Sequence, residues 1–227
     1  MLDVLFEQTP YANISPKAIE SKFIPTINPQ VEVSVPCAED LLGDKLTAFA
    51  PNTTGIPYYK HDNSMSMEII KQLYDIGCLF DISSNVAVIR GTFERVAQAE
   101  ISYRGGAMTN HDVLEDIFQT SLCLSTRGAI GSGNFDELQD GIKRVKSFIF
   151  TEPYHIENAI VSASKAAYLA TLISTNVEKI EKYANPMQVK DWSIADPEYN
   201  KLNRLKKTNT EAFFYWCKAI ENRGRMA

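Results

Sequence analysis

The stretch that decides the fold is VEVSVPCAEDLLGDKLTAFA, which occupies residues 31–50. Apolar and polar side chains alternate strictly over its first five residues, a pattern typical of a strand with one buried face and one wet face. Beyond Pro36 the apolar side chains recur every three or four residues, which predicts a helix over residues 38–50. The chain therefore changes from strand to helix at this point.

The flanking segments continue the two patterns. Residues 2–6 form a short apolar run interrupted by Asp3, which predicts another strand. No further strand is expected after Pro36. We expect an α+β fold that is mostly α, with a small sheet followed by a helical bundle, and two domains over residues 1–84 and 85–227. The predicted helices cover residues 38–50, 66–82, 86–103, 110–126, 135–150, 155–184 and 198–222.

Several helix ends carry local signals. Gly105 and Gly128 follow helical runs and are expected to stop them, because glycine adopts the left-handed conformation that ends many helices. Side chains that can accept a hydrogen bond from the first helical turn precede or open four of the helices. These predicted N-caps are Ser66, Asn85, Thr109 and Asn134.

The composition is that of an ordinary folded protein. The chain has 227 residues, of which 44% are hydrophobic and 22% charged, and a formal net charge of −5. These values exclude a wholly disordered chain, a collagen-like chain and a strongly basic nucleic-acid-binding chain.

The cysteines and the apolar segments indicate a cytoplasmic protein. Four cysteines are scattered along the chain without a Cys-x-x-Cys motif, which predicts reduced thiols rather than a disulfide framework or a structural zinc site. The N-terminus lacks the basic region of a signal peptide. Residues 159–174 are apolar but carry Lys165 and fall short of the ~20 residues that span a bilayer, so we expect a buried helix and no membrane anchor.

Lys45 is the most informative single residue. On a helical wheel it falls inside the apolar arc, between Leu41 and Phe49. This placement is unusual because an unpaired buried ammonium is costly. Two interpretations stay open: the stem is buried while the amine reaches water, or the amine is held over an anion such as a carboxylate or a polyphosphate.

Two aspartates are the other candidates. Asp3 interrupts an apolar strand, so it either binds a metal together with substrate phosphates or marks an exposed strand end. Asp75 lies opposite the apolar face of its helix, beside Glu68 and Lys71. Periodicity favours a weak, solvated pair between Lys71 and Asp75, although a polar face can also line a cleft.

Two other features carry no chemistry. Residues 131–133 (Gly-Ser-Gly) join two predicted helices, so they predict a turn and a cap rather than a phosphate-binding loop, which follows a strand. The histidines, His61, His111 and His155, show neither metal-ligand spacing nor a nucleophile partner.

Four segments together resemble a known family. Their order, spacing and flanking residues are similar to those of the nucleotidyltransferase toxins of the AbiEii/AbiGii type, found in type IV toxin–antitoxin and abortive-infection systems. The resemblance covers roughly residues 1–85. Its segments are residues 2–7 (LDVLFE), 39–49 (EDLLGDKLTAF), 51–58 (PNTTGIPY) and 68–76 (EIIKQLYDI).

The resemblance implies a fold and a set of site residues. The fold is a polymerase-β-like nucleotidyltransferase core followed by a helical domain, which would make the N-terminal sheet a small remnant of that core. Asp3 matches a strand carboxylate of the family that contributes to the metal site, and Lys45 matches the lysine that holds the nucleotide phosphates. Asp75 matches the aspartate that completes the cleft, and Lys71 is a further nucleotide-binding candidate. The implied cofactors are Mg²⁺ and a nucleoside triphosphate.

The chain departs from the family at its start. No Gly-Ser turn and Asp-x-Asp pair stand ahead of Asp3, so we expect a truncated or degenerate copy that lacks nucleotide transfer. The complete form would transfer a nucleoside monophosphate from a nucleoside triphosphate, with magnesium, to an RNA or protein acceptor. The alternative is a non-catalytic helical module that binds an antitoxin or another partner.

Two further partner predictions follow from charge and from the strand over residues 2–7. Residues 196–227 carry 7 basic and 4 acidic side chains, so this tail either contacts an RNA acceptor such as tRNA or consists of solvated helix faces. The exposed edge of the N-terminal strand would favour pairing with another chain, and thus an oligomer. The candidate RNA contacts are Lys201, Arg204, Lys206, Lys207, Arg223 and Arg225.

Overall fold

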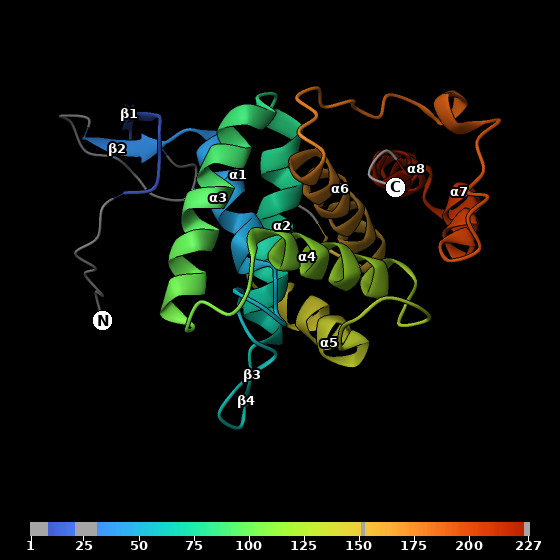
Figure 1. Cartoon of the computed structure of the whole chain (residues 1–227), viewed down its shortest axis with the longest axis horizontal. Helices are drawn as coiled ribbons and strands as arrows, with labels where there is room; N and C mark the ends of the chain where they lie inside the picture. Colours follow the sequence, from blue (N-terminus) through green and yellow to red (C-terminus); the bar gives the residue numbers. More distant parts are fainter. Residues whose placement is uncertain (1–8, 21–30, 151–152, 225–227) are drawn as a thin grey trace.

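The computed structural model describes residues 9–20, 31–150 and 153–224. The strand predicted over residues 2–6, with Asp3, lies outside these residues. The described chain is mostly helical, with a small two-stranded sheet followed by helices, as expected. Figure 1 shows this sheet and the C-terminal helices at opposite ends of the long axis.

The N-terminal sheet consists of β1 (Ile14–Ala18) and β2 (Glu32–Pro36), which run antiparallel. β2 confirms the strand predicted from alternation, but the expected buried face is wrong, because the side chain of Val33 is 42% exposed. β1 was not predicted, because its sequence ISPKA does not alternate and contains a proline.

A second, very short hairpin corrects the expectation of no strand after Pro36. It consists of β3 (Tyr59–Lys60) and β4 (Asn63–Ser64). The hydroxyls of Tyr59 and Ser64 both donate to Glu137, so side chains rather than strand length hold this hairpin against the helices.

Asp40 connects the N-terminal segment to the helices. Its fully buried carboxylate accepts hydrogen bonds from the backbone N–H groups of Ala12 at 3.0 Å and Asn13 at 2.8 Å, and from the hydroxyl of Thr92. Burial alone raises the pKa of Asp40, but the hydrogen bonds from Thr92, Ala12 and Asn13 outweigh it and lower the pKa to about 2. Asp40 therefore helps to fix the residues that precede β1, together with Asp44, which accepts from the Tyr11 hydroxyl, and Arg95, which donates to the Pro10 carbonyl.

The helices largely follow the predicted ranges, and α2 and α3 have the predicted bounds. Asn85, Thr109 and Asn134 are confirmed as N-caps, whereas Met65 precedes α2 and Ser66 is its first residue. The helices are α1 (Ala38–Ala48), α2 (Ser66–Ile82), α3 (Val86–Tyr103), α4 (Asn110–Ser125), α5 (Phe135–Val145), α6 (Ile156–Ser174), α7 (Leu205–Thr208) and α8 (Thr210–Gly224), with 3₁₀ helices at Pro186–Val189 and Asn200–Arg204.

Three predicted helices differ from the structure. The helix predicted over residues 135–150 ends at Val145. The helix predicted over residues 155–184 ends at Ser174, and Asn176 adopts a left-handed conformation with φ 54° that stops it. The helix predicted over residues 198–222 is divided into a 3₁₀ turn, α7 and α8. Gly105 and Gly128 adopt positive φ after α3 and α4, as expected of helix stops.

One continuous core holds the helices together. α6 packs between α4 and α8, and α2 packs against α1, α5 and α6. The rings of Phe118 on α4 and Trp216 on α8 meet edge to face at 5.4 Å. Among the described residues, no helix is long and apolar enough to cross a membrane. The packing places α2 at the centre, with one face turned toward α1 and another toward α6.

Candidate active site

The structure brings two of the sequence-predicted site residues together. The Lys45 ammonium on α1 lies 3.0 Å from a carboxylate oxygen of Asp75 on α2. The same ammonium donates to the side-chain carbonyl of Gln72 at 3.0 Å. The two side chains of the ion pair are 29% and 41% exposed, so the pair lies at the protein surface within reach of a ligand.

The surroundings of Lys45 follow from the helical periodicity of α1. Leu42 and Leu46 are fully buried, and Phe49 after the helix is buried as well. Lys45 leaves this apolar face and reaches across to α2. Of the two open interpretations, an anion does face the amine, and within the described residues this anion is the carboxylate of Asp75.

The predicted pairing of Asp75 with Lys71 is wrong. Asp75 pairs with Lys45, while the Lys71 ammonium lies 4.1 Å from the centre of the Phe148 ring. The helical wheel of α2 alone could not show this, because the residues that contact Asp75 and Lys71 lie outside α2. Lys45 is on α1, and Phe148 follows α5. Lys71 therefore does not join the cluster formed by Lys45, Gln72 and Asp75.

Gln72 is a site residue that the sequence reasoning missed. It lies one turn before Asp75 on the same side of α2 and orients the Lys45 ammonium from a second direction. An ammonium offers three N–H donors, and these two contacts use two of them.

The segment over residues 51–58 fixes how α1 and α2 are placed. The carboxylate of Asp116 on α4 accepts from the backbone N–H of Asn52 at 2.8 Å and from the hydroxyl of Thr53 at 2.9 Å. The guanidinium of Arg104 donates to the carbonyls of Thr54 at 2.6 Å and Gly55 at 2.9 Å. This family-like segment is thus a turn between α1 and α2 that is held against α4 and the end of α3.

The described residues do not by themselves fit a magnesium site. Among residues 9–20, 31–150 and 153–224, no group of three or more His, Cys, Asp or Glu side chains could hold a metal ion. Asp75 is a single carboxylate already paired with Lys45, whereas Mg²⁺ requires a nearly octahedral set of oxygen ligands. Asp3, the predicted metal ligand, lies outside the described residues.

Three of the basic side chains predicted to contact RNA make contacts within the protein instead. The ammonium groups of Lys201 and Lys206 donate to backbone carbonyls at 3.1 and 2.7 Å, and Arg223 pairs with Glu115 at 2.6 Å. Arg225 lies outside the described residues. The remaining two, Arg204 and Lys207, are exposed.

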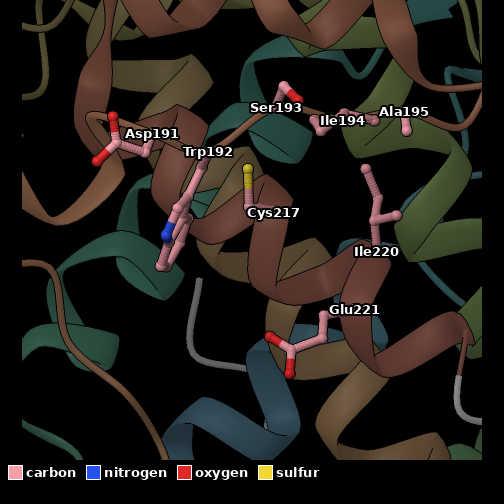
Figure 2. A pocket seen from close by; sticks show the side chains of 8 residues that line it. All are labelled: Asp191, Trp192, Ser193, Ile194, Ala195, Cys217, Ile220 and Glu221. Atoms are coloured by element: carbon pink, nitrogen blue, oxygen red, sulfur yellow. The ribbon is translucent and has the colours of Figure 1, made fainter.

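A separate cavity of about 430 Å³ lies between α8 and residues 191–195. Figure 2 shows the Trp192 ring and the Cys217 thiol beside this cavity, with Ile220 and Glu221 farther along α8. Burial raises the pKa of Cys217 to about 12, so its thiol stays protonated near neutral pH. None of the residues that contact Lys45 lines this cavity.

Comparison with known proteins gives one family. The family model described as "Nucleotidyl transferase AbiEii toxin, Type IV TA system" matches residues 1–155. This match includes all four segments of the resemblance and extends beyond residue 85 through α5. No curated protein and no solved structure matches the chain.

Proposed function

Because the chain belongs to the AbiEii family of nucleotidyl transferase toxins of type IV toxin–antitoxin systems, we propose that Lys45 holds the phosphates of a nucleoside triphosphate. The reaction we propose is transfer of a nucleoside monophosphate from this triphosphate to a hydroxyl group of an RNA or protein acceptor. The partners that this reaction requires are the triphosphate and the acceptor, and the family suggests an antitoxin as a further partner.

The observation that carries the proposal is the geometry around the Lys45 ammonium. Asp75 and Gln72 hold it at 3.0 Å each and leave its third N–H donor for a phosphate oxygen. The side chain is 29% exposed, so a triphosphate can approach without disrupting either contact. A cation fixed in place before the substrate arrives stabilises developing negative charge without reorganisation.

The proposed chemistry is a single displacement at the α-phosphorus. The acceptor hydroxyl oxygen forms a bond to this phosphorus, the bond from phosphorus to the bridging oxygen of the β-phosphate breaks, and pyrophosphate leaves. The hydroxyl proton passes to water. In such transfers the protein contributes mainly positioning and charge neutralisation, which are the tasks that Lys45 and Asp75 can perform. When bound, Mg²⁺ would supply further charge neutralisation.

Titration calorimetry with each nucleoside triphosphate, in buffer with magnesium, tests the proposal. We expect the wild-type protein to bind at least one triphosphate and Lys45→Met to bind it at least ~10-fold more weakly, because a charged hydrogen bond to phosphate contributes roughly 1.5–3 kcal/mol. Lys71→Met and Lys190→Met are the matched controls, since Lys71 faces the Phe148 ring and Lys190 is exposed. Both should bind as the wild type does.

Equal binding by wild type and Lys45→Met would contradict the role of Lys45. An absence of triphosphate binding in all variants would favour the non-catalytic interaction module instead. Transfer of a radiolabelled nucleoside monophosphate onto total cellular RNA, assayed in parallel, tests the acceptor class.

A further inference from the structure

A second cavity lies along α2, on a face of this helix next to the one that carries Asp75. It has a volume of about 220 Å³ and is bounded by α2, α6 and the start of α8. Tyr74 and Cys78 line it, and they stand one residue before Asp75 and one helical turn after it. The cavity and the proposed phosphate-binding group are therefore reached from adjacent sides of one helix.

The inner end of this cavity holds a buried ammonium between two carboxylates. Lys165 on α6 is only 4% exposed, and its ammonium lies 2.7 Å from Asp81 on α2 and 3.1 Å from Glu211 on α8. These contacts use two of the three N–H donors and one oxygen of each carboxylate. The ammonium also lies 5.7 Å from the centre of the Phe80 ring and 5.8 Å from the centre of the Tyr215 ring. The groups left to meet a ligand are therefore the second oxygens of the two carboxylates, whose side chains are 57% and 35% exposed.

The walls are aromatic and polar. The rings of Tyr74 and Tyr154 meet edge to face at 5.3 Å. Tyr154 is only 3% exposed, whereas Tyr74 is half-buried, so Tyr74 is the ring that a ligand can reach. The hydroxyl of Ser162 and the amide of Asn158 also line the cavity. The amide oxygen of Asn158 accepts from the backbone N–H of His155, which leaves its NH₂ group as a donor.

We propose that this cavity binds the base of a nucleoside. The cavity is smaller than the 300–1,000 Å³ typical of drug-sized ligands, so it suits a single ring system. The Tyr74 ring can stack on any base, and the mixture of donors and acceptors matches the edge of a base rather than a simple ion. The carboxylates of Asp81 and Glu211 outweigh the single positive charge of Lys165, so this part of the cavity disfavours anions. We therefore expect the phosphate groups of a nucleotide to lie outside the cavity.

The same groups give the cavity a preference among bases. Carboxylate oxygens accept hydrogen bonds from exocyclic amino groups, while the NH₂ group of Asn158 can donate to a ring nitrogen or carbonyl. Adenine, cytosine and guanine carry such an amino group, whereas uracil has one N–H between two carbonyls. Uridine is therefore the weakest ligand. The assignment of this base to a substrate rests on the proposed function, and two sources fit: the triphosphate donor and the terminal nucleoside of the RNA acceptor.

Alkylation of Cys78 reports occupancy of the cavity directly. Cys78 is exposed and lines the cavity, whereas burial raises the pKa of the Cys37, Cys123 and Cys217 thiols and slows their reaction. We expect millimolar adenosine, cytidine or guanosine to slow the alkylation of Cys78 several-fold, measured by peptide mass spectrometry. Uridine should protect less, and N-acetylcysteine in the same solution corrects for loss of reagent.

Two variants locate the ligand. Glu211→Gln keeps the shape of the side chain but removes a carboxylate, and Ser162→Ala removes one lining hydroxyl. Both should lose most of the protection while circular dichroism shows an unchanged fold. Lys45→Met should keep the protection by nucleosides, so this result does not depend on phosphate binding.

The choice of ligand separates the two sources. If the base belongs to the donor, a triphosphate protects Cys78 at lower concentration than its nucleoside, and Lys45→Met abolishes this advantage. If it belongs to the acceptor, the triphosphate gives no advantage and a short RNA oligonucleotide protects better than the nucleoside. Failure of every nucleoside to protect Cys78, or equal protection by uridine, would overturn the assignment even if Lys45 binds triphosphate.

Discussion

The contact between Lys45 and Asp75 is an exposed ion pair, which by itself contributes little to stability. Both side chains are partly exposed and lie 3.0 Å apart. Exposed ion pairs contribute only about 0–1 kcal/mol to folding, because water competes for both charges. Selection for stability alone would gain little from this pair, whereas a held ammonium is useful to a bound anion.

This difference gives a residue-scale prediction for Asp75→Asn. The free energy of unfolding in urea should change by less than ~1 kcal/mol, because the charges are solvated. The affinity for triphosphate, measured by calorimetry, should nevertheless fall several-fold, because the Lys45 ammonium loses the carboxylate that helps to hold it in place. A large loss of stability with unchanged triphosphate affinity would show that the pair is structural.

Asp40 differs from Asp75 because its carboxylate is fully buried and its hydrogen bonds stabilise the folded protein. Its pKa in the folded protein is about 2, below the usual 3.8. A lowered folded-state pKa contributes stability that is fully present above about pH 4 and is lost as the pH falls toward 2. The loss should approach about 2 kcal/mol at 1.36 kcal/mol per pKa unit. Urea unfolding between pH 5 and 2 should show this slope in the wild type and a shallower one in Asp40→Asn.

At the scale of the helices, α1 and α3 can pack closely because residue 43 on α1 is a glycine. A Cβ atom at Gly43 would lie 2.5 Å from the carbonyl oxygen of Ile89 and 2.9 Å from the backbone nitrogen of Phe93. Since both are backbone atoms, the two helices would have to separate. Lys45 lies two residues farther along α1, so the position of the site depends on this contact.

The element-scale prediction compares two glycines. Gly43→Ala should destabilise the protein by about 1–3 kcal/mol, as overpacking does, and should weaken triphosphate binding by displacing Lys45. Gly91→Ala on α3 is the control, because its Cβ would meet only the Arg95 side chain at 3.3 Å. Alanine is the better helix former, so this variant should gain up to ~1 kcal/mol in thermal or urea unfolding. A neutral Gly43→Ala would contradict the close-packing argument.

At the scale of the whole molecule, Lys165 links three helices that are far apart in sequence. It joins Asp81 on α2 and Glu211 on α8 from the middle of α6, and α8 lies beyond the region that the family model matches. Only the ammonium of this triad is deeply buried, since the side chains of Asp81 and Glu211 are 57% and 35% exposed.

The triad predicts an asymmetric response to substitution. Lys165→Met removes the buried charge and leaves carboxylates that water can reach, so stability should change by less than ~1 kcal/mol. The double variant Asp81→Asn/Glu211→Gln leaves an unpaired buried ammonium and should lose roughly 3–5 kcal/mol. Equal effects in urea unfolding would contradict this account of the buried charge.

The sequence by itself determined the helical class, the bounds of α2 and α3, three N-caps and the family. Helical periodicity and capping act within a few residues, so a single chain segment contains the information. The division into domains at residue 84, the metal role of Asp3 and the catalytic roles of Lys45 and Asp75 stay predictions.

Only the tertiary structure decided which side chains meet. The partner of Asp75 is on α1 rather than one turn away, and Lys71 turns to Phe148. Asp116, Arg104 and the Lys165 triad likewise join segments distant in sequence. The physical reason is that a charged side chain settles where opposite charge and burial are both satisfied. That place depends on the packing of all the helices and not on the periodicity of any one.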